Sequence, residues 1–225
     1  SMLSTPLLML LYERVLAPRF LRTEERAPDA IDETNPVIIA GFGRFGQVVS
    51  RVLGGMKIRA TVVDHDPNQI ELVRRFGSKA YYGDATRLDL LEAAGARKAK
   101  LLVVAVDDPD NAMRIVTLAR KHFRQLKLIV RAHSRSDAFE YAELGVPAVR
   151  ETFGSALDAA EGALHGFGYG KVAARRIVTR FRRHDEQGLA EQARHRKDVK
   201  KLITLSQQGR QDLKQLLASE AGKRA

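Results

Sequence analysis

The chain has 225 residues, 44% of them hydrophobic, which is enough for one sizeable core with an appendage. Cysteine is absent, which excludes a disulfide-stapled fold, thiolate metal sites and cysteine nucleophiles. The formal net charge of +11 is concentrated at one end: residues 171–225 contain 15 lysines and arginines against 6 acidic residues, whereas residues 1–170 contain 23 against 21.

The first 35 residues divide into an apolar and a polar segment. Residues 3–11 are mostly apolar, but crossing a bilayer takes about 20 residues, and a signal peptide would need different flanks. Two interpretations stay open: the end of a longer helix, or an amphipathic helix packed on the domain. Residues 21–35 are polar, contain Pro28 and lack a helical period, so we interpret them as a linker.

From residue 36 onward, short β-branched runs alternate with helical patterns. The expected strands are 37–40, 60–64, 79–82, 101–106, 126–132 and 146–149. The expected helices between them are 45–54, 66–77, 88–94, 109–123 and 137–144. The apolar positions expected on the inner faces of the first two helices are Val48, Val49, Val52, Leu53, Ile70, Val73 and Phe76. Thr86 or Asp84 is expected to cap the third helix. This alternation predicts an α/β fold with a doubly wound parallel sheet and right-handed crossovers.

After residue 152 only helices are expected. They cover 153–167, 171–183 and 199–217 and form a C-terminal helical arm. Its apolar stripes consist of Val172, Ile177, Val178 and Phe181 on one helix and of Leu202, Leu205, Leu213 and Leu216 on another. These stripes are narrow and the charged faces are wide, which suits packing against a second copy of the chain. The positive charge indicates either a solvated surface or a surface that meets nucleic acid, an anionic membrane or an acidic partner.

A glycine-rich fingerprint follows the first expected strand and opens the first helix. It runs Gly41-Phe42-Gly43-Arg44-Phe45-Gly46, the G-x-G-x-x-G pattern of a Rossmann-like nucleotide site. Gly41 permits the tight turn, Gly43 lets a phosphate approach the backbone, and Gly46 lets helix and strand pack closely. The start of the helix then offers free N–H groups to that phosphate.

Acidic residues stand at the ends of the next strands. Asp64 ends the second strand, 18 residues after Gly46, where a carboxylate accepts both ribose hydroxyls and repels a 2′-phosphate. The site therefore favours AMP or NAD(H) over NADP. His65, Asp84, Ala85 and Asp107 lie on the same rim and complete the predicted site. The competing interpretation is that the glycines serve packing and that these acidic residues cap helices.

Several motifs occur together and in order. They are IIAGFGRFGQ (38–47), VVDHDPNQIE (62–71), FGSKAYYGDATRLDLLEAAG (76–95), VDDPDNA (106–112) and RETF (150–153). In these motifs the chain resembles the regulatory domain of Kef-type glutathione-gated potassium-efflux proteins, a member of the RCK or KTN group. The resemblance covers about residues 1–190, and YERVLAPRF (12–20) resembles the junction that follows the last membrane helix of those transporters.

This resemblance implies a regulator rather than an enzyme. It implies a homodimer on the cytoplasmic face of the bacterial inner membrane, joined to an antiporter domain that exports K⁺ in exchange for H⁺. A quinone-oxidoreductase-like ancillary subunit is implied as a further partner, and no nucleic acid. The implied domains are 1–20 as helix end and junction, 21–35 as linker, 36–151 as nucleotide-binding domain and 152–225 as dimerisation extension.

The resemblance also implies a glutathione site at the dimer interface. Arg51 and Arg150 match the family's glutathione-contacting arginines, and guanidinium groups bind carboxylates in a bidentate manner. The family often has asparagine where this chain has Asp185. An aspartate cannot donate a hydrogen bond as asparagine does, so it either binds the γ-glutamyl amine or pairs with Arg183. No metal site is expected.

Two other functions compete with regulation. An NAD(H)-dependent oxidoreductase needs a second domain with proton-transfer groups, but His165, His184 and His195 have neither triad nor metal spacing. A ligand-responsive DNA-binding repressor needs a helix-turn-helix, and no convincing one is found. Fold alone does not decide between them.

Overall fold

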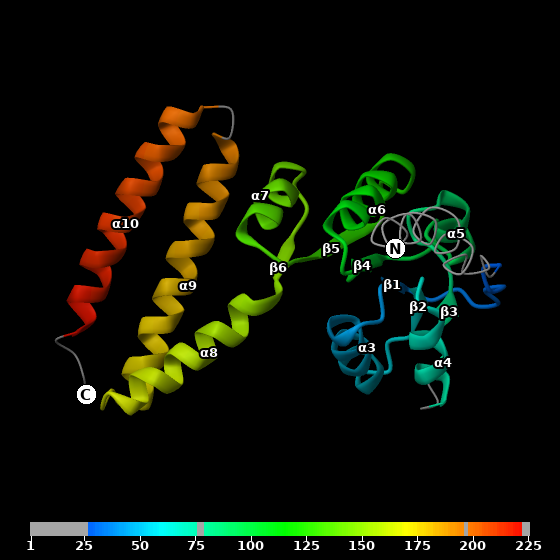
Figure 1. Ribbon diagram of the computed structural model, residues 1–225, viewed down its shortest axis with the longest axis horizontal. Coiled ribbons are helices and arrows are strands. Elements are labelled where there is room, and N and C mark those ends of the chain that lie inside the picture. Colours follow the sequence, from blue (N-terminus) through cyan, green and yellow to red (C-terminus); the bar gives the residue numbers. More distant parts are fainter. Residues whose placement is uncertain (1–26, 76–78, 196–197, 222–225) are drawn as a thin grey trace, which may run out of the picture.

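The computed structural model describes residues 27–75, 79–195 and 198–221, and within these ranges it forms one parallel sheet with a helical arm (Figure 1). The strands are β1 (Val37–Ala40), β2 (Ala60–Asp64), β3 (Tyr81–Tyr82), β4 (Leu101–Val104), β5 (Lys127–Ala132) and β6 (Ala148–Arg150). Their order is β3-β2-β1-β4-β5-β6, and every pair is parallel. The strand order reverses between β1 and β4, so the expected α/β fold with a doubly wound, Rossmann-like sheet is confirmed.

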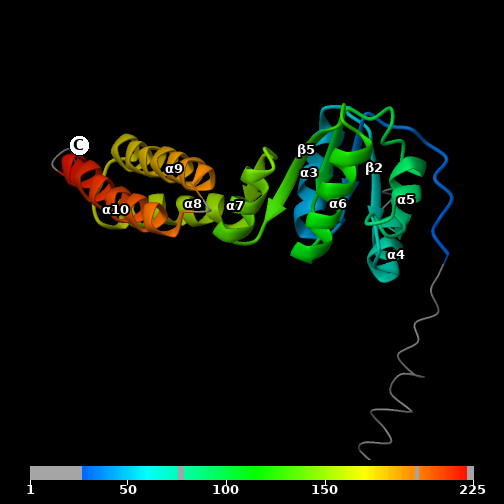
Figure 2. The same ribbon diagram turned by 90° about the horizontal axis from the view of Figure 1, so that it is seen from above.

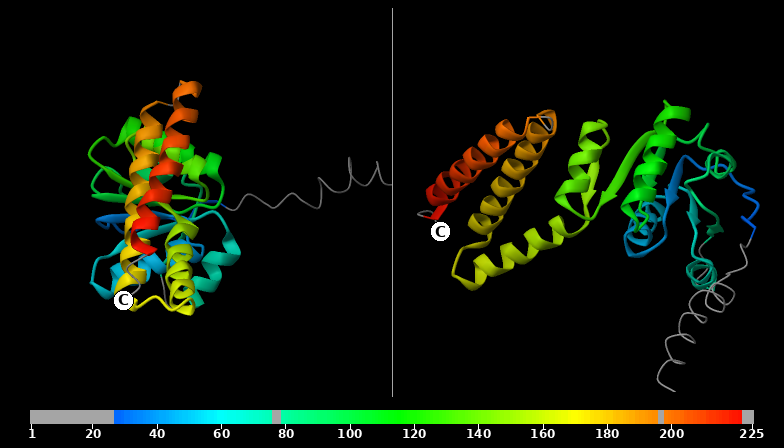
Figure 3. Two further views of the ribbon diagram at one scale, coloured as in Figure 1. Left: turned by 90° about the vertical axis from the view of Figure 1, so that its left-hand side faces the viewer. Right: turned by 45° about the horizontal axis from the view of Figure 1, so that its top comes forward.

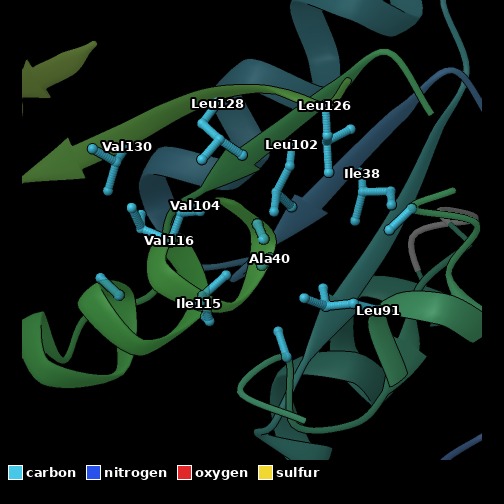
Figure 4. Packing of buried hydrophobic residues seen from close by; sticks show 14 of the residues in the cluster. Ile38, Ala40, Leu91, Leu102, Val104, Ile115, Val116, Leu126, Leu128 and Val130 are labelled. Carbon is cyan, nitrogen blue, oxygen red and sulfur yellow. The ribbon is translucent and has the colours of Figure 1, made fainter. Parts of the chain in front are cut away.

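Helices cover both faces of the sheet (Figure 2). They are α3 (Arg44–Gly55), α4 (Pro67–Arg75), α5 (Leu88–Ala93), α6 (Pro109–His122) and α7 (Arg135–Glu143). Side chains alternate along each strand, so β1 sends Ile38 and Ala40 into one core and Val37 and Ile39 into the other. Figure 4 shows the larger core, in which Leu91 of α5 and Ile115 of α6 pack on the strands.

The boundaries of four strands differ from expectation, and β5 differs only in beginning at Lys127 instead of at 126. β3 has two paired residues instead of four, and β4 ends at Val104 where the chain turns toward α6. β6 begins two residues later than expected, because Val146 is buried in the loop and its N–H donates to the carbonyl of Tyr141. The apolar residues were recognised correctly, but burial in a loop gives the same pattern as burial in a strand.

The cap of α5 and the start of α7 also differ from expectation. α5 begins after Arg87 and no side chain caps it, so the prediction that Thr86 or Asp84 caps this helix is wrong. Asp84 instead accepts both the N–H and the hydroxyl of Thr86, each at 2.8 Å, and so shapes the turn before the helix. α7 begins at Arg135 rather than at 137, because Ser134 and Asp137 form a capping box.

The predicted inner face of α3 is half right. Val49 and Leu53 pack against the core, but the side chains of Val48 and Val52 are 59% and 64% exposed. Together with Met56, which is 72% exposed, these two residues form an apolar stripe on the outer face, which we call the α3 stripe. The sheet can cover only one side of a helix, and the stripe lies on the side turned away from it. Phe76 lies outside the described residues.

The arm consists of α8 (Glu151–Gly166), α9 (Lys171–Arg194) and α10 (Val199–Ala221), and it stands off the β6 edge of the sheet (Figure 3). α9 continues eleven residues beyond the expected end at 183, where it packs against α7 and α10. Its buried positions are Ala173, Ala174 and Val178, whereas Val172 is 77% exposed, contrary to prediction. The four leucines predicted for the stripe of α10 are half-buried.

Candidate functional site

The glycine loop joins the end of β1 to the start of α3, and two of its glycines are sterically required. Gly41 has φ 96°, and a Cβ there would lie 2.6 Å from the backbone carbon of Ala105. A Cβ on Gly46 would lie 2.1 Å from the carbonyl oxygen of Gly41. Both distances are far below any real contact, so the close packing of loop, helix and strand depends on the absence of a side chain.

Gly43 differs from the other two glycines because a Cβ there would meet nothing within 4 Å. Its φ of −66° is open to any residue, so the fold itself does not require glycine. Gly43 is the N-cap of α3, and no side chain in the described parts of the chain caps this helix. The first turn of α3 therefore has uncapped N–H groups at the positive end of the helix dipole, an arrangement suited to an anion.

Asp64 ties the glycine loop to the end of β2. Its Oδ2 accepts the N–H of Phe42 at 2.5 Å, and its Oδ1 accepts the N–H of Asp66 at 2.8 Å. The residue is only 8% exposed, yet it faces the cavity described below. Each carboxylate oxygen has a second lone pair, so Asp64 can hold the loop and still accept hydroxyl groups from a ligand.

Two glutamines fix the same loop, and sequence analysis missed them. Gln47 of α3 and Gln69 of α4 each donate from Nε2 to the carbonyl oxygen of Phe42 at 3.1 Å. Phe42 is therefore held on its N–H side by Asp64 and on its carbonyl side by two amides. Gln69 is 27 residues away in sequence from Phe42, so no local pattern reveals the contact.

A cavity of about 490 Å³ lies at the carboxyl ends of the strands β1 to β4. Five predicted residues line it: Gly41, Asp64, His65, Asp84 and Ala85. Other lining residues that the sequence did not single out are Ala27, Pro28, Tyr82, Arg87 and Asn111. Phe42, Gly43, Arg44, Phe45 and Gly46 form the adjoining loop and first turn of α3, and they are not among its lining residues.

Two of the predicted rim residues, Asp107 and His65, differ from the others in how they lie relative to the cavity. Asp107 is not among the lining residues of the cavity; Asp108 lines it instead and also caps α6 by accepting the N–H of Asn111 at 2.7 Å. His65 has a side chain that is 74% exposed, and its Nδ1 lies 3.5 Å from Asp64 Oδ1. The cavity therefore carries carboxylates at the ends of both β2 and β4.

Asp107 belongs to a second cluster, centred on Arg131 at the end of β5. The Arg131 side chain is only 4% exposed and donates to Asp107 at 2.5 Å, to Glu151 at 2.6 and 3.0 Å, and to the carbonyl of Ala105 at 3.2 Å. Glu151 is the first residue of α8, so this arginine joins the sheet rim to the base of the arm. Sequence analysis missed it, although a charge between the buried residues Val130 and Ala132 was a usable signal.

The residues predicted to bind glutathione lie in two places. Arg51 is exposed on α3 and makes no ion pair with the described residues. Arg150 is 14% exposed, lies 3.5 Å over the ring of Phe153, and pairs with Asp185 of α9. Asp185 also pairs with Arg135 of α7, so of the two alternatives for this residue, pairing with Arg183 is not the one that the structure shows. The helix places Arg183 and Asp185 on different sides, which two-residue spacing requires.

Comparison with known proteins adds to this geometry. A family model described as the TrkA-N domain matches residues 37–150, and one described as the potassium efflux system KefB C-terminal domain matches residues 155–225. The glutathione-regulated potassium-efflux system protein KefC of Salmonella arizonae is 42% identical over 200 residues, which is 88% of this chain. The chain spans 32% of the length of such curated relatives.

Two solved structures resemble the chain. The Kef C-terminal domain of Shewanella denitrificans in its AMP-bound form is 47% identical, has a TM-score of 0.65, and covers 72% of this chain and 98% of its own. The GsuK channel bound to NAD is 18% identical with a TM-score of 0.50, covers 65% of this chain and 27% of its own, and shows the fold alone. Among the helices of the described residues, none is both long and apolar enough to cross a membrane.

Proposed function

The chain belongs to the TrkA-N domain family and, within it, to the Kef C-terminal domains, and on that premise we propose that it senses ligands for a potassium-efflux system. The proposed ligands are an adenine nucleotide in the cavity and glutathione or its adducts at a dimer interface. The proposed whole protein is a K⁺/H⁺ antiporter of the bacterial inner membrane, with this domain on the cytoplasmic face. The observation that carries the proposal is the cavity beside the glycine loop, in a chain 47% identical to an AMP-bound Kef domain.

The cavity suits an adenosine nucleotide. The first turn of α3 offers N–H groups and open space at Gly43 for a phosphate, and the next strand offers Asp64 for the ribose hydroxyls. A 2′-phosphate next to that carboxylate would be repelled, so AMP and NAD(H) are favoured over NADP. We propose a regulatory role for this ligand and no catalytic step, and we propose no nucleic acid as partner.

Replacing Gly43 with valine is expected to weaken AMP binding about 5- to 100-fold and to leave stability nearly unchanged, because its Cβ meets open space that only the phosphate needs. Asp64→Ala should weaken binding to a similar degree and also loosen the loop. Calorimetry with AMP and NADH measures the affinities, and urea unfolding measures the stability. Gly54→Ala, a change on the same helix away from the loop, is the matched control. Unchanged affinity in both Gly43→Val and Asp64→Ala contradicts the proposed site.

We propose that the domain works as a homodimer. The α3 stripe is exposed in one chain, as are Phe167 and Val172 at the turn between α8 and α9, at 82% and 77%. Isolated apolar side chains are common on surfaces, but a stripe along one helix face is typical of an interface. A second copy related by a two-fold axis can cover both places at once.

Arg51, Arg150 and Asp185 are proposed to hold glutathione in that interface. The two guanidinium groups suit its two carboxylates, and Asp185 suits its γ-glutamyl ammonium group. In this structure Asp185 neutralises Arg150, so a ligand carboxylate must compete for that arginine. Such a ligand regulates only if it binds two subunit arrangements with different affinity. A quinone-oxidoreductase-like subunit is the further partner proposed for the full protein.

Arg51→Ala and Arg150→Ala are each expected to reduce glutathione affinity about tenfold while AMP affinity stays within twofold of the wild type, because the two sites share no residue. Calorimetry on the purified chain, with light scattering to follow its oligomeric state, gives both values. Arg114→Ala, an exposed arginine on α6, is the control. The glutathione assignment is wrong if the wild-type dimer binds none, or if both variants bind it as the wild type does.

A further inference from the structure

Residues 27–35, which we call the strap, run along the outer edge of the sheet and lead into β1. They are the blue segment beside β3 in Figure 1, and Figure 2 shows them passing outside α5. The strap was expected to be part of a linker. It is instead bonded to the sheet along most of its length, and its first two residues, Ala27 and Pro28, line the nucleotide cavity.

Asp29 attaches the N-terminal end of the strap to Tyr82, the last residue of β3. Its backbone N–H donates to the carbonyl of Tyr82 at 2.9 Å, and its Oδ2 accepts the N–H of Tyr82 at 2.6 Å. Arg74 of α4 donates to the same Oδ2 at 2.7 Å and also to the carbonyl of Ala80 at 2.7 and 3.0 Å. The carboxylate thus extends the hydrogen-bonding pattern of an edge strand and is charge-assisted by the arginine.

The C-terminal part of the strap, residues 32–35, has separate attachments that do not touch the cavity. Asp32 accepts hydrogen bonds from Tyr81 Oη at 2.5 Å and from Lys79 Nζ at 2.8 Å, and these donors, Lys79 first, lower the pKa of Asp32 to about 2. Asn35 is buried and donates to Thr61 Oγ1 at 3.2 Å. The strap is therefore attached near its N-terminal end by Asp29 and farther along by Asp32 and Asn35. Of these attachments, the one at Asp29 is next to the cavity.

The order of the strands shows which part of a nucleotide faces the strap. The phosphate site follows β1, the ribose-binding Asp64 ends the neighbouring strand β2, and β3 with the strap comes next. A nucleotide laid along this rim with its phosphate at α3 points its base away from β1. On that side the cavity is bounded by Ala27, Pro28 and Tyr82.

We propose that the strap is the base-side wall of the nucleotide site and that Asp29 is the positioning residue that holds this wall in place. The proposal rests on the nucleotide site proposed above and adds a residue to it. Because binding energies are reciprocal, a nucleotide that packs against Ala27 and Pro28 also strengthens the attachment of the strap to β3. Nucleotide occupancy is then linked to the point at which the chain from residues 1–26 joins the domain.

The test compares substitutions at two strap positions, Asp29 and Asp32, in the whole chain. Asp29→Ala is expected to weaken AMP binding about fivefold or more, with Asp29→Asn in between because it keeps an acceptor for the N–H of Tyr82. Asp32→Ala removes the bonds to Lys79 and Tyr81, which do not touch the cavity, and should leave AMP affinity within twofold. Hydrogen exchange gives the second readout: AMP should slow exchange of the Asp29 amide in the wild type, and this protection should be lost in Asp29→Ala.

The outcomes separate this inference from the proposed function. If the wild type binds no AMP, the nucleotide site itself fails. If AMP binds but Asp29→Ala keeps wild-type affinity, or the Asp29 amide is not protected, the nucleotide site stands and the strap has no part in it. Equal losses in Asp29→Ala and Asp32→Ala, with lowered urea midpoints in both, would mean that the strap only stabilises the fold, and this also overturns the proposal.

Discussion

Gly46→Ala is expected to abolish detectable AMP binding and to lower the free energy of unfolding by about 3 kcal/mol. The added methyl group would lie 2.1 Å from the carbonyl oxygen of Gly41, a backbone atom of the glycine loop that we propose holds the phosphate. Neither atom belongs to a flexible side chain, so α3 must move away from β1. That movement also breaks the contacts of Gln47 and Asp64 with Phe42. Urea unfolding and calorimetry measure the two effects.

The control for Gly46→Ala lies on the same helix. A Cβ on Gly54 meets nothing within 4 Å, so Gly54→Ala should stabilise the domain by up to about 1 kcal/mol through helix propensity alone. A Gly46→Ala variant that unfolds like the wild type and binds AMP normally would show that the helix and strand are less tightly packed than described.

Arg131→Met is expected to cost about 3 kcal/mol of stability, the lower end of the range for breaking a buried ion pair. The variant leaves Glu151 without its two hydrogen bonds at the base of the arm and leaves the carbonyl of Ala105 without its side-chain donor. The side chain of Asp107 is 81% exposed, so water can replace its bond to Arg131 at little cost. The expected loss of stability therefore stays at the lower end of the range. Urea unfolding followed by circular dichroism gives the value.

An exposed arginine provides the comparison for Arg131. Arg97 pairs with Glu92 at the surface, and its side chain is 66% exposed, so Arg97→Met should cost less than about 1 kcal/mol. If the two variants are equally stable, burial does not make the Arg131 cluster important. Arg131→Lys keeps the positive charge but replaces the forked guanidinium group with a single ammonium group. It is therefore expected to recover only part of the stability lost in Arg131→Met.

The sheet and the glycine loop were predictable because their signals are local. β-branched runs, helical spacing and turn residues occur within about ten residues of one another, and the G-x-G-x-x-G pattern sits between a strand and a helix. The steric need for Gly41 and Gly46 follows from the same local geometry. Asp64 was also found from its spacing, although its two backbone hydrogen bonds were not foreseen.

The features that sequence analysis missed depend on contacts between distant residues. Gln69 meets Phe42 across 27 residues, and Asp29 meets Tyr82 across 53. The exposure of Val48 and Val52 could not be predicted from helical spacing, because an apolar face toward the sheet and one toward a second copy give similar patterns. The partners of Arg131 were not predictable for a related reason, since they come from two other segments, the turn after β4 and the start of α8.

The helical arm is long and is attached to the sheet near one end. In the described residues it joins the sheet near the β6 edge, through β6, the pairing of Glu151 with Arg131 and the contacts of α9 with α7. Helix α9 itself has 24 residues and is about 36 Å long. A rotation of about 5° at one end of a helix of this length displaces its other end by about 3 Å. A small rotation at the attached end would therefore move the tip of the arm farther than its base.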